Sequence, residues 1–580
     1  MLQNLLHIFL VSFIAVIWGF PLQILQQKKT AGHYTLNAET IIYSFFTGII
    51  LIGLVSSWLV LFMPLNYIVL VIITAFIALT ELWWFKKVNQ KKLLLVRTNA
   101  VRFNTATAFF FCAVLLFLFL GSGGPVMEDT GLYHIQIIRW DQQYGTVTGL
   151  ANLYLRYGFS SNWFHLISLF SFPFSHQNFL FLNITLSIWF TFFLLNKIQL
   201  SFSNPQSRPQ RILGIFSFLA LAYMLMEWDL LRGNASSTSY DFIVTALILI
   251  VLSLITENFL LKKEPGNNFI LILVLSIGIP FFKLTGIFIL PILFVYFIIT
   301  RQGLKRYFSS LIIFLLFLVP YLAKNYIQTG YFMYPFQAFS GILKPDWQVP
   351  GELLTRFTDY MNLGNRYINH SIPAQAWDSN HGMFFGWIPI WMRSLTLLDK
   401  ILSLLTVAGI LLSFLMPTFR QKRNNKLKSI YYSCVLLLPC WFFTSPDPRF
   451  VYGLLLFIAF LPFSWLFENY VKGVFIKIGF ILLISAMILY VIPKIKKWDP
   501  ESFILPPSIP VPPHQTINDF DYPFYLPEII TKNWNMRCYD SPLPCIYQLN
   551  PYLETRGKEI KDGFRMKPVT DSIFILHYNY

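Results

Sequence analysis

The sequence predicts an all-α protein that crosses a membrane many times. Hydrophobic residues make up 56% of its 580 residues, and charged residues only 12%. A soluble protein could not cover its surface with so few polar groups, and apolar runs of roughly 17–25 residues recur along the chain. Lys and Arg collect in the short links between these runs, as is typical of cytoplasmic loops. Together these observations predict a polytopic bundle of about 12–14 transmembrane helices.

The basic residues also set the predicted orientation. The formal net charge is +17, but it is concentrated in short links, so it indicates orientation and excludes a surface for nucleic acid. With these links in the cytoplasm, the N-terminus lies outside; the first run also fits an uncleaved signal anchor, because no small-residue cleavage site follows it. The links contain Lys86, Lys87, Lys91, Lys92, Arg97 and Arg102; Lys197, Arg208 and Arg211; Lys262 and Lys263; Arg301, Lys305 and Arg306; and Arg420, Lys422, Arg423, Lys426 and Lys428.

The apolar runs divide the chain into three regions. We expect N-terminal transmembrane helices in 1–103, a transmembrane core in 104–492 with outer loops 122–177 and 324–397, and an extracytoplasmic tail in 493–580. The predicted spans lie near 7–25, 39–62, 64–85, 104–121, 178–196, 212–226, 240–261, 268–282, 284–300, 307–323, 398–416, 429–444, 450–467 and 473–492.

Two of the five cysteines predict a disulfide. Cys538 and Cys545, in CYDSPLPC, lie in the tail, which the topology places in an oxidising compartment. A zinc site would need further ligands at suitable spacing, and the sequence offers none. The other three cysteines lie in apolar spans and are expected to pack there.

The segment 124–164 carries a dense group of ionisable residues directly after a predicted span. GSGGP ends that span, and the adjacent carboxylates Glu128 and Asp129 follow. Ionised groups close to a membrane are costly to desolvate, so such a group indicates a functional site. Further ionisable residues in and just after the segment are His134, Arg139, Asp141, Arg156 and His165.

The same segment predicts a helix across Gly131–Gln143. Asp129 or Thr130 is expected to cap it, since a carboxylate favours the positive end of a helix. Three apolar or aromatic residues recur on one face at helical spacing, which suits a helix that lies on the membrane surface with aromatic anchors. These residues are Tyr133, Ile137 and Trp140. The alternative is ordinary packing, which is the expected role of each aromatic residue taken singly.

Three cations from distant parts of the sequence are expected on the same outer side. The apolar run from Phe269 to Ile299 is longer than one span needs, and a hairpin turning at GIPFFKLTG places Lys283 outside. Lys324 follows a span in KNYIQTGYFMYPF, and Arg449 lies in the short turn SPDPRF. We expect all three to contact an anionic group. The alternative for Lys283 is a side chain that reaches the membrane interface without a ligand.

Two further outer links are polar. The link Glu227–Asp241 carries four ionisable residues and reads either as a solvated loop with helix caps or as part of the site. The loop 324–397 is rich in Trp, Tyr, Asn and Gly, a composition that suits sugar rings. Its ionisable residues include Asp346, Glu352, Arg356, Asp359, Arg366, His370, Asp378 and His381.

These residues together predict sugar transfer from a lipid-linked sugar phosphate. A carboxylate deprotonates the acceptor hydroxyl, and Arg or Lys holds the phosphate leaving group. The sequence contains no Walker loop, dinucleotide fingerprint, H-E-x-x-H or G-x-S-x-G motif. The energy must therefore come from an activated substrate.

The order of these motifs resembles the GT-C superfamily, the polytopic glycosyltransferases that use polyprenyl-phosphate sugars. Its members include protein O-mannosyltransferases and lipid A aminoarabinose transferases. The acidic pair after a span, KNYIQTGYFMYP, FKLTG and DPRF are similar to segments of bacterial members. GLANLYLRYGFSSNWF resembles a hallmark of a less characterised bacterial group placed in that superfamily. The resemblance covers roughly residues 104–465.

The resemblance implies a GT-C-like bundle and a role for each site residue. Asp129 would be the general base of an inverting hexosyl transfer, and Glu128 a second acidic partner. Lys283, Lys324 and Arg449 would contact phosphate or substrate. The remaining substrate-binding candidates are His134, Arg139 and Arg156.

The resemblance also implies partners and a location. The donor would be a polyprenyl-phosphate sugar and the acceptor a glycan, lipid or protein, with the active face on the extracytoplasmic side of the inner (plasma) membrane. The chain departs from the family pattern in three extra N-terminal spans and in the lack of a second carboxylate pair. These departures leave the acceptor and a divalent cation open, and no other cofactor is implied.

Two other functions fit parts of the sequence. A cell-surface polysaccharide polymerase or ligase also has arginines in outer loops but does not need the carboxylate pair. A transporter of lipid-linked glycans would place ionisable residues at the membrane midplane in repeated halves, and the sequence has few there. A purely structural role is the remaining alternative.

Overall fold

The structure, a computed structural model of the whole chain, describes residues 2–28, 34–88, 94–96, 105–174, 179–203, 206–262, 268–338, 343–368, 372, 386–415, 425–495, 509–528, 537–569, 571 and 574. Three ionisable residues of the predicted outer loop, His370, Asp378 and His381, lie outside these ranges. So do Lys263 and most of the basic residues of the links at 89–104 and 416–424.

Helices dominate the described residues. Ten of these helices are long and apolar enough to cross a membrane: α1 (Leu2–Lys28), α2 (Ala38–Leu59), α4 (Thr105–Ser122), α7 (Phe181–Ser203), α8 (Arg208–Met226), α9 (Asp241–Leu260), α12 (Leu304–Thr329), α16 (Leu397–Leu415), α18 (Asn425–Thr444) and α20 (Gly473–Ile495). Shorter apolar helical stretches of 10–17 residues lie at Tyr67–Trp83 within α3 (Tyr67–Val88), at Phe269–Phe281 with α10 (Phe269–Gly278), at Leu284–Ile299 with α11 (Ile289–Ile299) and at α19 (Tyr452–Phe467). Every predicted span coincides with one of these helices, which confirms an all-α polytopic membrane protein.

Short helices and strands form the links and the tail. The helices are η1 (Thr130–His134, a π-helix), α5 (Ile135–Gln143), η2 (Leu150–Asn152), η3 (Leu155–Gly158), α6 (Asn162–Leu169), η4 (Trp228–Arg232), η5 (Ile279–Phe281), η6 (Leu284–Phe288), α13 (Gly351–Arg366), α15 (Ile388–Ser394), η8 (Pro448–Phe450) and η9 (Ile560–Asp562). Three two-stranded sheets pair β1 (Tyr34–Leu36) with β2 (Leu94–Val96) in parallel, and β3 (His514–Ile517) with β4 (Phe524–Pro527) and β5 (Leu553–Thr555) with β6 (Phe564–Met566) in antiparallel.

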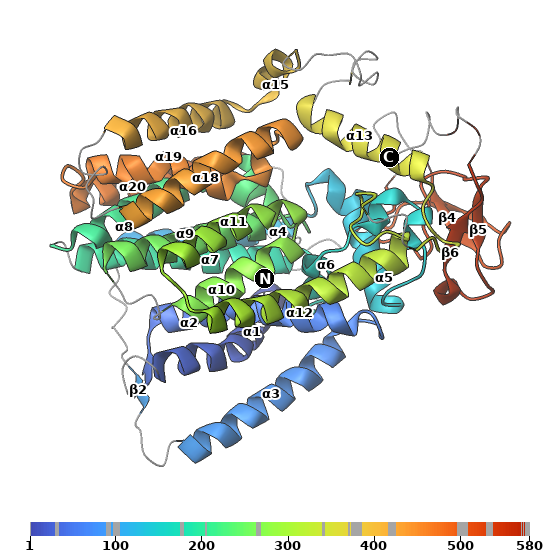
Figure 1. Cartoon of the computed structure of the whole chain (residues 1–580), viewed down its shortest axis with the longest axis horizontal. Coiled ribbons are helices and arrows are strands. Elements are labelled where there is room, and N and C mark those ends of the chain that lie inside the picture. The colour runs from blue at the N-terminus through green and yellow to red at the C-terminus, as the bar shows by residue number, and fades with distance from the viewer. Residues whose placement is uncertain are drawn as a thin grey trace.

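The long helices run side by side, and the link segments gather at one end of the bundle. Figure 1 shows α5, α6 and the strands β4, β5 and β6 together at the right of the view, with one end of α13 above them. We call this the site end. Helix α9 is buried along most of its length at the centre of the bundle, whereas α12 and α20 leave most of their surface open to the surroundings.

Helices α1 and α2 are held together by backbone contact at two glycines. A Cβ atom added to Gly19 would lie 1.9 Å from the Ser44 carbonyl oxygen, and one added to Gly48 would lie 1.8 Å from that of Ala15. In a membrane, small residues favour helix association because they allow backbones to approach closely. No other residue type fits at these two positions without separating the helices.

The end of α12 differs from the prediction. The segment KNYIQT continues the helix to Thr329, and Gly330 ends it in the left-handed conformation at φ +79°. The polar side chains of Lys324, Asn325 and Gln328 are buried on this last turn. The outer loop therefore begins about one and a half turns later than its predicted start at residue 324.

Two expectations for the segment after α4 are also wrong. Asp129 has helical backbone angles and makes no capping bond with its side chain, because the chain is already helical at Glu128. The aromatic face of α5 is not a membrane anchor. Its residues are buried within the protein, and the Trp140 ring packs edge-on against Phe564 of the tail at 5.9 Å.

The close contact of α1 and α2 gives a stability prediction. Gly48→Ala should lower the melting temperature of the detergent-solubilised protein by several degrees, because its methyl group forces the two backbones apart. Gly364→Ala, on α13, is the matched control, since nothing lies within 4 Å of its added Cβ. Equal melting temperatures for the two variants would contradict the packing described above.

Candidate functional site

Five separate segments of the chain bring charged side chains together at the site end. They are η1 with the helical residue directly before it, η3, the start of α9, the link between η5 and η6, and η8. We call the resulting group the acid–cation cluster. It consists of Asp129, His134, Arg156, Asp241, Lys283 and Arg449.

Asp129 is the carboxylate on which the cations of the cluster act. Its Oδ1 lies 4.0 Å from the Arg156 guanidinium, and 36% of its side chain is exposed. Desolvation raises the pKa of Asp129, but the positive charges of Arg156, Arg449 and Lys283 favour its ionised form, and its pKa lies below the ordinary value. Asp129 is therefore ionised at neutral pH and able to accept a proton.

Arg156 is fixed from several sides. Its guanidinium carbon lies 5.5 Å from the centre of the Tyr133 ring, a cation–π contact. Desolvation lowers the pKa of Arg156, but nearby tyrosines and Asp129 raise it above its ordinary value, so it stays charged. Its Nε is buried and has no hydrogen-bond partner among the described residues. A buried donor of this kind is suited to an anionic oxygen.

Lys283 lies in an extended link between two 3₁₀ turns and is paired with Asp241. Its Nζ donates to Asp241 Oδ1 and lies 4.8 Å from the centre of the Tyr240 ring and 4.1 Å from that of Phe450. Desolvation lowers the pKa of Lys283, and the neighbouring Arg449 adds to this effect. Asp241 begins α9, so this pair joins the centre of the bundle to the link at residue 283.

Arg449 is held by its own turn. The Asp447 carboxylate accepts from the Arg449 backbone N–H at 3.0 Å, and its other oxygen lies 2.6 Å from Arg449 Nε. The turn at Pro448 thus orients the Arg449 guanidinium. The Arg449 side chain remains 34% exposed. This exposure leaves room for an anion beside the existing pair.

His134 is a neutral member of the cluster. Its Nδ1 lies 3.0 Å from the Thr238 hydroxyl, and its ring packs between Tyr133, Phe164 and Tyr240. Burial lowers the pKa of His134 to about 4, although Asp129 acts in the opposite direction. At neutral pH it can donate or accept a hydrogen bond but carries no charge.

Three predicted site residues lie elsewhere. Glu128 points outward with 61% of its side chain exposed and pairs with Arg537 of the tail at 2.8 Å. Arg139 makes two bonds to the Asp540 carboxylate of the tail, at 2.5 and 2.7 Å. These contacts to the tail, about 400 residues away in sequence, turn both side chains from the cluster.

Lys324 is the third predicted site residue that lies outside the acid–cation cluster. Its Nζ lies 2.7 Å from Asp141 Oδ1 and 2.8 Å from His165 Nε2, and all three side chains are at most 1% exposed. Its ammonium is thus bonded to Asp141 of α5 and to His165 of α6, and it links α12 to both helices. A substrate phosphate would not reach it in this arrangement.

A family model described as "Domain of unknown function (DUF8201)" matches residues 1–456. The chain belongs to this family. The DUF8201 match includes every residue of the acid–cation cluster and ends before the tail. No curated protein matches the chain, and no solved structure matches it.

Sequence reasoning underrated two acidic residues of this DUF8201 protein. Asp241 and Asp447 lie in segments that the sequence placed on the outer side but were not among the predicted site residues, yet each pairs directly with a cluster cation. The position of Asp241 could have indicated its role. It is the first residue of an apolar span, and because an unpaired carboxylate there is costly to desolvate, the position predicts a cationic partner. Among the described residues, no group of three or more His, Cys, Asp or Glu is placed to hold a metal ion.

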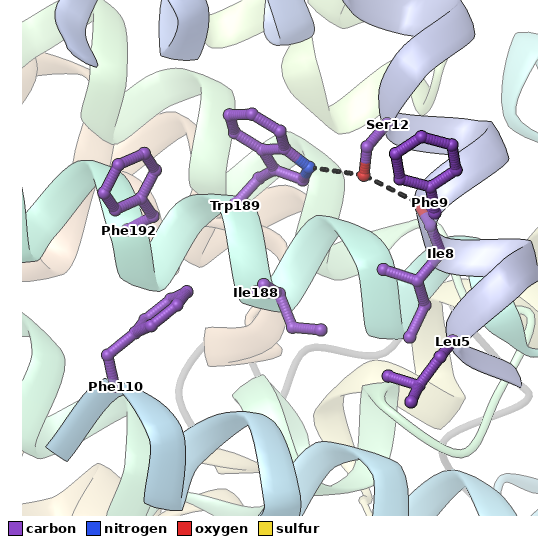
Figure 2. A pocket seen from close by; sticks show the side chains of 8 residues that line it. All are labelled: Leu5, Ile8, Phe9, Ser12, Phe110, Ile188, Trp189 and Phe192. Carbon is purple, nitrogen blue, oxygen red and sulfur yellow. Dashed lines mark hydrogen bonds between the residues drawn. The ribbon is translucent and has the colours of Figure 1, made fainter. Parts of the chain in front are cut away.

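A separate apolar groove lies between the transmembrane helices. Its volume is about 390 Å³, and its polar groups are already bonded: Trp189 Nε1 donates to Ser12 Oγ at 2.8 Å, and Ser12 Oγ to the Ile8 carbonyl at 2.6 Å. Figure 2 shows these two bonds within an otherwise apolar lining. The lining comes from α1, α4 and α7 and consists of Leu5, Ile8, Phe9, Ser12, Phe110, Ile188, Trp189 and Phe192. The groove shares no residue with the acid–cation cluster.

The buried position of Lys324 gives the second prediction. Lys324→Met should destabilise the protein by about 3–5 kcal/mol, because the buried Asp141 carboxylate loses its ammonium partner and keeps only the His165 ring, 3.6 Å away. The double variant Asp141→Asn/Lys324→Met should recover much of that loss, as measured by unfolding in denaturant. A Lys324→Met variant of normal stability and reduced substrate binding would instead favour the substrate contact that the sequence predicts.

Proposed function

We propose that this protein is an inverting membrane glycosyltransferase with a GT-C-like organisation. It moves a sugar from a polyprenyl-phosphate donor to an acceptor hydroxyl on the extracytoplasmic face of the plasma membrane. The observation that carries the proposal is that one partly exposed carboxylate, Asp129, lies within electrostatic range of Arg156, Lys283 and Arg449 at the end of a transmembrane bundle. Cations and a base in one place are what the transfer from a sugar phosphate requires.

The reaction assigns a part to each charge. Asp129 accepts the proton of the acceptor hydroxyl as its oxygen attacks the anomeric carbon. The bond from that carbon to the phosphate oxygen breaks, and its electron pair leaves with the polyprenyl phosphate. Arg156 and Arg449 stabilise the added negative charge on the leaving phosphate, and Lys283 contributes when the phosphate competes with Asp241 for its ammonium.

Binding of the donor phosphate makes Asp129 a stronger base. In the free protein the neighbouring cations hold the pKa of Asp129 low, which keeps it ionised but weakens it as a base. A bound phosphate neutralises part of that positive charge and lets the pKa of Asp129 rise. Proton acceptance is then favoured only after the donor has bound, a coupling that suits a general base.

The matched pair Glu128 and Asp129 provides the main test. Asp129→Asn should lower sugar transfer by at least about 100-fold, because the base is lost, whereas Glu128→Gln should stay within about threefold of wild type. The assay uses purified protein in liposomes with a panel of polyprenyl-phosphate hexoses, and it measures transfer and donor binding separately. Transfer retained in Asp129→Asn would favour a polysaccharide polymerase or ligase, and no transfer by the wild type from any donor would reject the proposal.

A pH profile tests the role of the cations. The kcat/KM of the wild type reports the free protein and should fall only as the pH drops through the lowered pKa of Asp129. Arg156→Gln removes a nearby positive charge, so the pKa of Asp129 rises and the acid limb of kcat/KM moves to higher pH. Arg565→Gln, which removes an exposed cation of the tail paired with Glu554, is the control and should leave the limb in place. If the acid limb of Arg156→Gln stays where it is in the wild type, the limb does not report the titration of Asp129.

A further inference from the structure

The tail contacts the segment that carries Asp129 at successive turns. The Tyr539 N–H donates to the Gly131 carbonyl at 3.0 Å, and the Tyr547 hydroxyl donates to the Leu132 carbonyl. Gln136 Nε2 donates to the carbonyl oxygens of Tyr539 and Ser541, each at 3.0 Å. The paired Arg139 and Asp540 extend this contact along α5. Most of these tail residues belong to the loop Cys538–Cys545.

That loop is closed and well anchored. Cys538 and Cys545 form the disulfide that the sequence predicts, with their Cα atoms 6.1 Å apart, and both are fully buried. Covalent closure restricts the loop to few conformations, so its backbone groups present a fixed surface to η1. Gly131 has no room for a side chain against this surface, since a Cβ there would lie 2.3 Å from the Tyr539 ring.

The same loop reaches the segment that carries Arg156. The Tyr157 hydroxyl donates to the Cys545 carbonyl at 3.2 Å, and the ring centres of Tyr154 and Tyr547 lie 4.5 Å apart. Tyr154 and Tyr157 flank Arg156 in sequence, just as Gly131 follows Asp129 by two positions. One closed loop therefore touches both segments whose charged side chains meet at 4.0 Å.

We propose that the disulfide-closed loop Cys538–Cys545 is a positioning element that fixes Asp129 relative to Arg156. Its positioning residues are Tyr539 and Cys545, which act through the backbone of η1 and through Tyr157 and do not touch substrate. The inference rests on the proposed function in so far as Asp129 is the base, but the fixed geometry itself can be measured without any reaction.

The first experiment uses the intact wild-type protein. Reduction with a phosphine in detergent, checked by mass spectrometry, should raise hydrogen–deuterium exchange at least tenfold in residues 130–134 and 155–158 and leave α9 unchanged. Unchanged exchange in 130–134 after complete reduction overturns the positioning role. Raised exchange after reduction, in a protein that transfers no sugar even before reduction, supports the positioning role and counts against the glycosyltransferase.

The second experiment separates positioning from stability. Gly131→Ala should lower kcat about tenfold, with the KM for the donor within twofold, and should move the acid limb to higher pH in the same direction as Arg156→Gln. Tyr539→Gly added to Gly131→Ala should restore the wild-type limb, because it removes the ring that occupies the space and because glycine suits the φ of +40° at this position. If Gly131→Ala lowers the amount of active protein but leaves the acid limb of the pH profile in place, the contact between Gly131 and Tyr539 is merely structural. That result would overturn the inference.

Discussion

The ion pair between Lys283 and Asp241 is the contact on which much of the structure depends. Both side chains lie where transmembrane segments end, and isolated charges there carry a large desolvation cost. Pairing them joins the first turn of α9 to the link between α10 and α11. The aromatic rings of Tyr240 and Phe450 cover the ammonium and bring in the turns before α9 and α19. The cluster thus forms where the ends of four helices, α9, α10, α11 and α19, meet around one largely buried ammonium.

A second group of paired charges, one lysine between two glutamates, lies toward the other end of the same helix. Lys197 of α7 bonds to Glu257 of α9 and Glu39 of α2, each at 2.7 Å. Glu257 follows Asp241 by 16 positions, or about 24 Å of helix at 1.5 Å per residue. Helix α9 is therefore tied by charge near both ends and packed by apolar side chains between them. Such a helix is a firm support for groups that must keep fixed distances.

Much of the fold was predictable because the membrane acts on short stretches of sequence. Each span needs its own apolar run, and basic links mark one side, so the spans and the common side of Asp129, Lys283 and Arg449 followed from local patterns. The partners of Glu128, Arg139 and Lys324 were not predictable in this way. Each lies on a segment far away in sequence, and a lone charged residue has no local pattern that distinguishes a buried ion pair from a substrate contact.

The contacts of the tail could not be predicted from the sequence. Its two cysteines predicted a closed loop, but its short strands and aromatic residues gave no sign of what the loop would cover. The helical spacing of Tyr133, Ile137 and Trp140 correctly marked one apolar face. That face is covered by the protein itself, with Phe564 of the tail against Trp140, and not by lipid. Periodicity identifies a face that will be buried, and only long-range contacts decide what buries it.

The contact between η1 and the loop Cys538–Cys545 also sets an order of assembly. Arg139 and Asp540 are separated by 401 positions, and the whole series of transmembrane helices after η1 must be inserted before the two segments can meet. During synthesis the segment with Asp129 therefore leaves the ribosome long before the residues that immobilise it. A chain interrupted between Arg449 and Cys545 would carry the complete acid–cation cluster and lack the part that locks it in place.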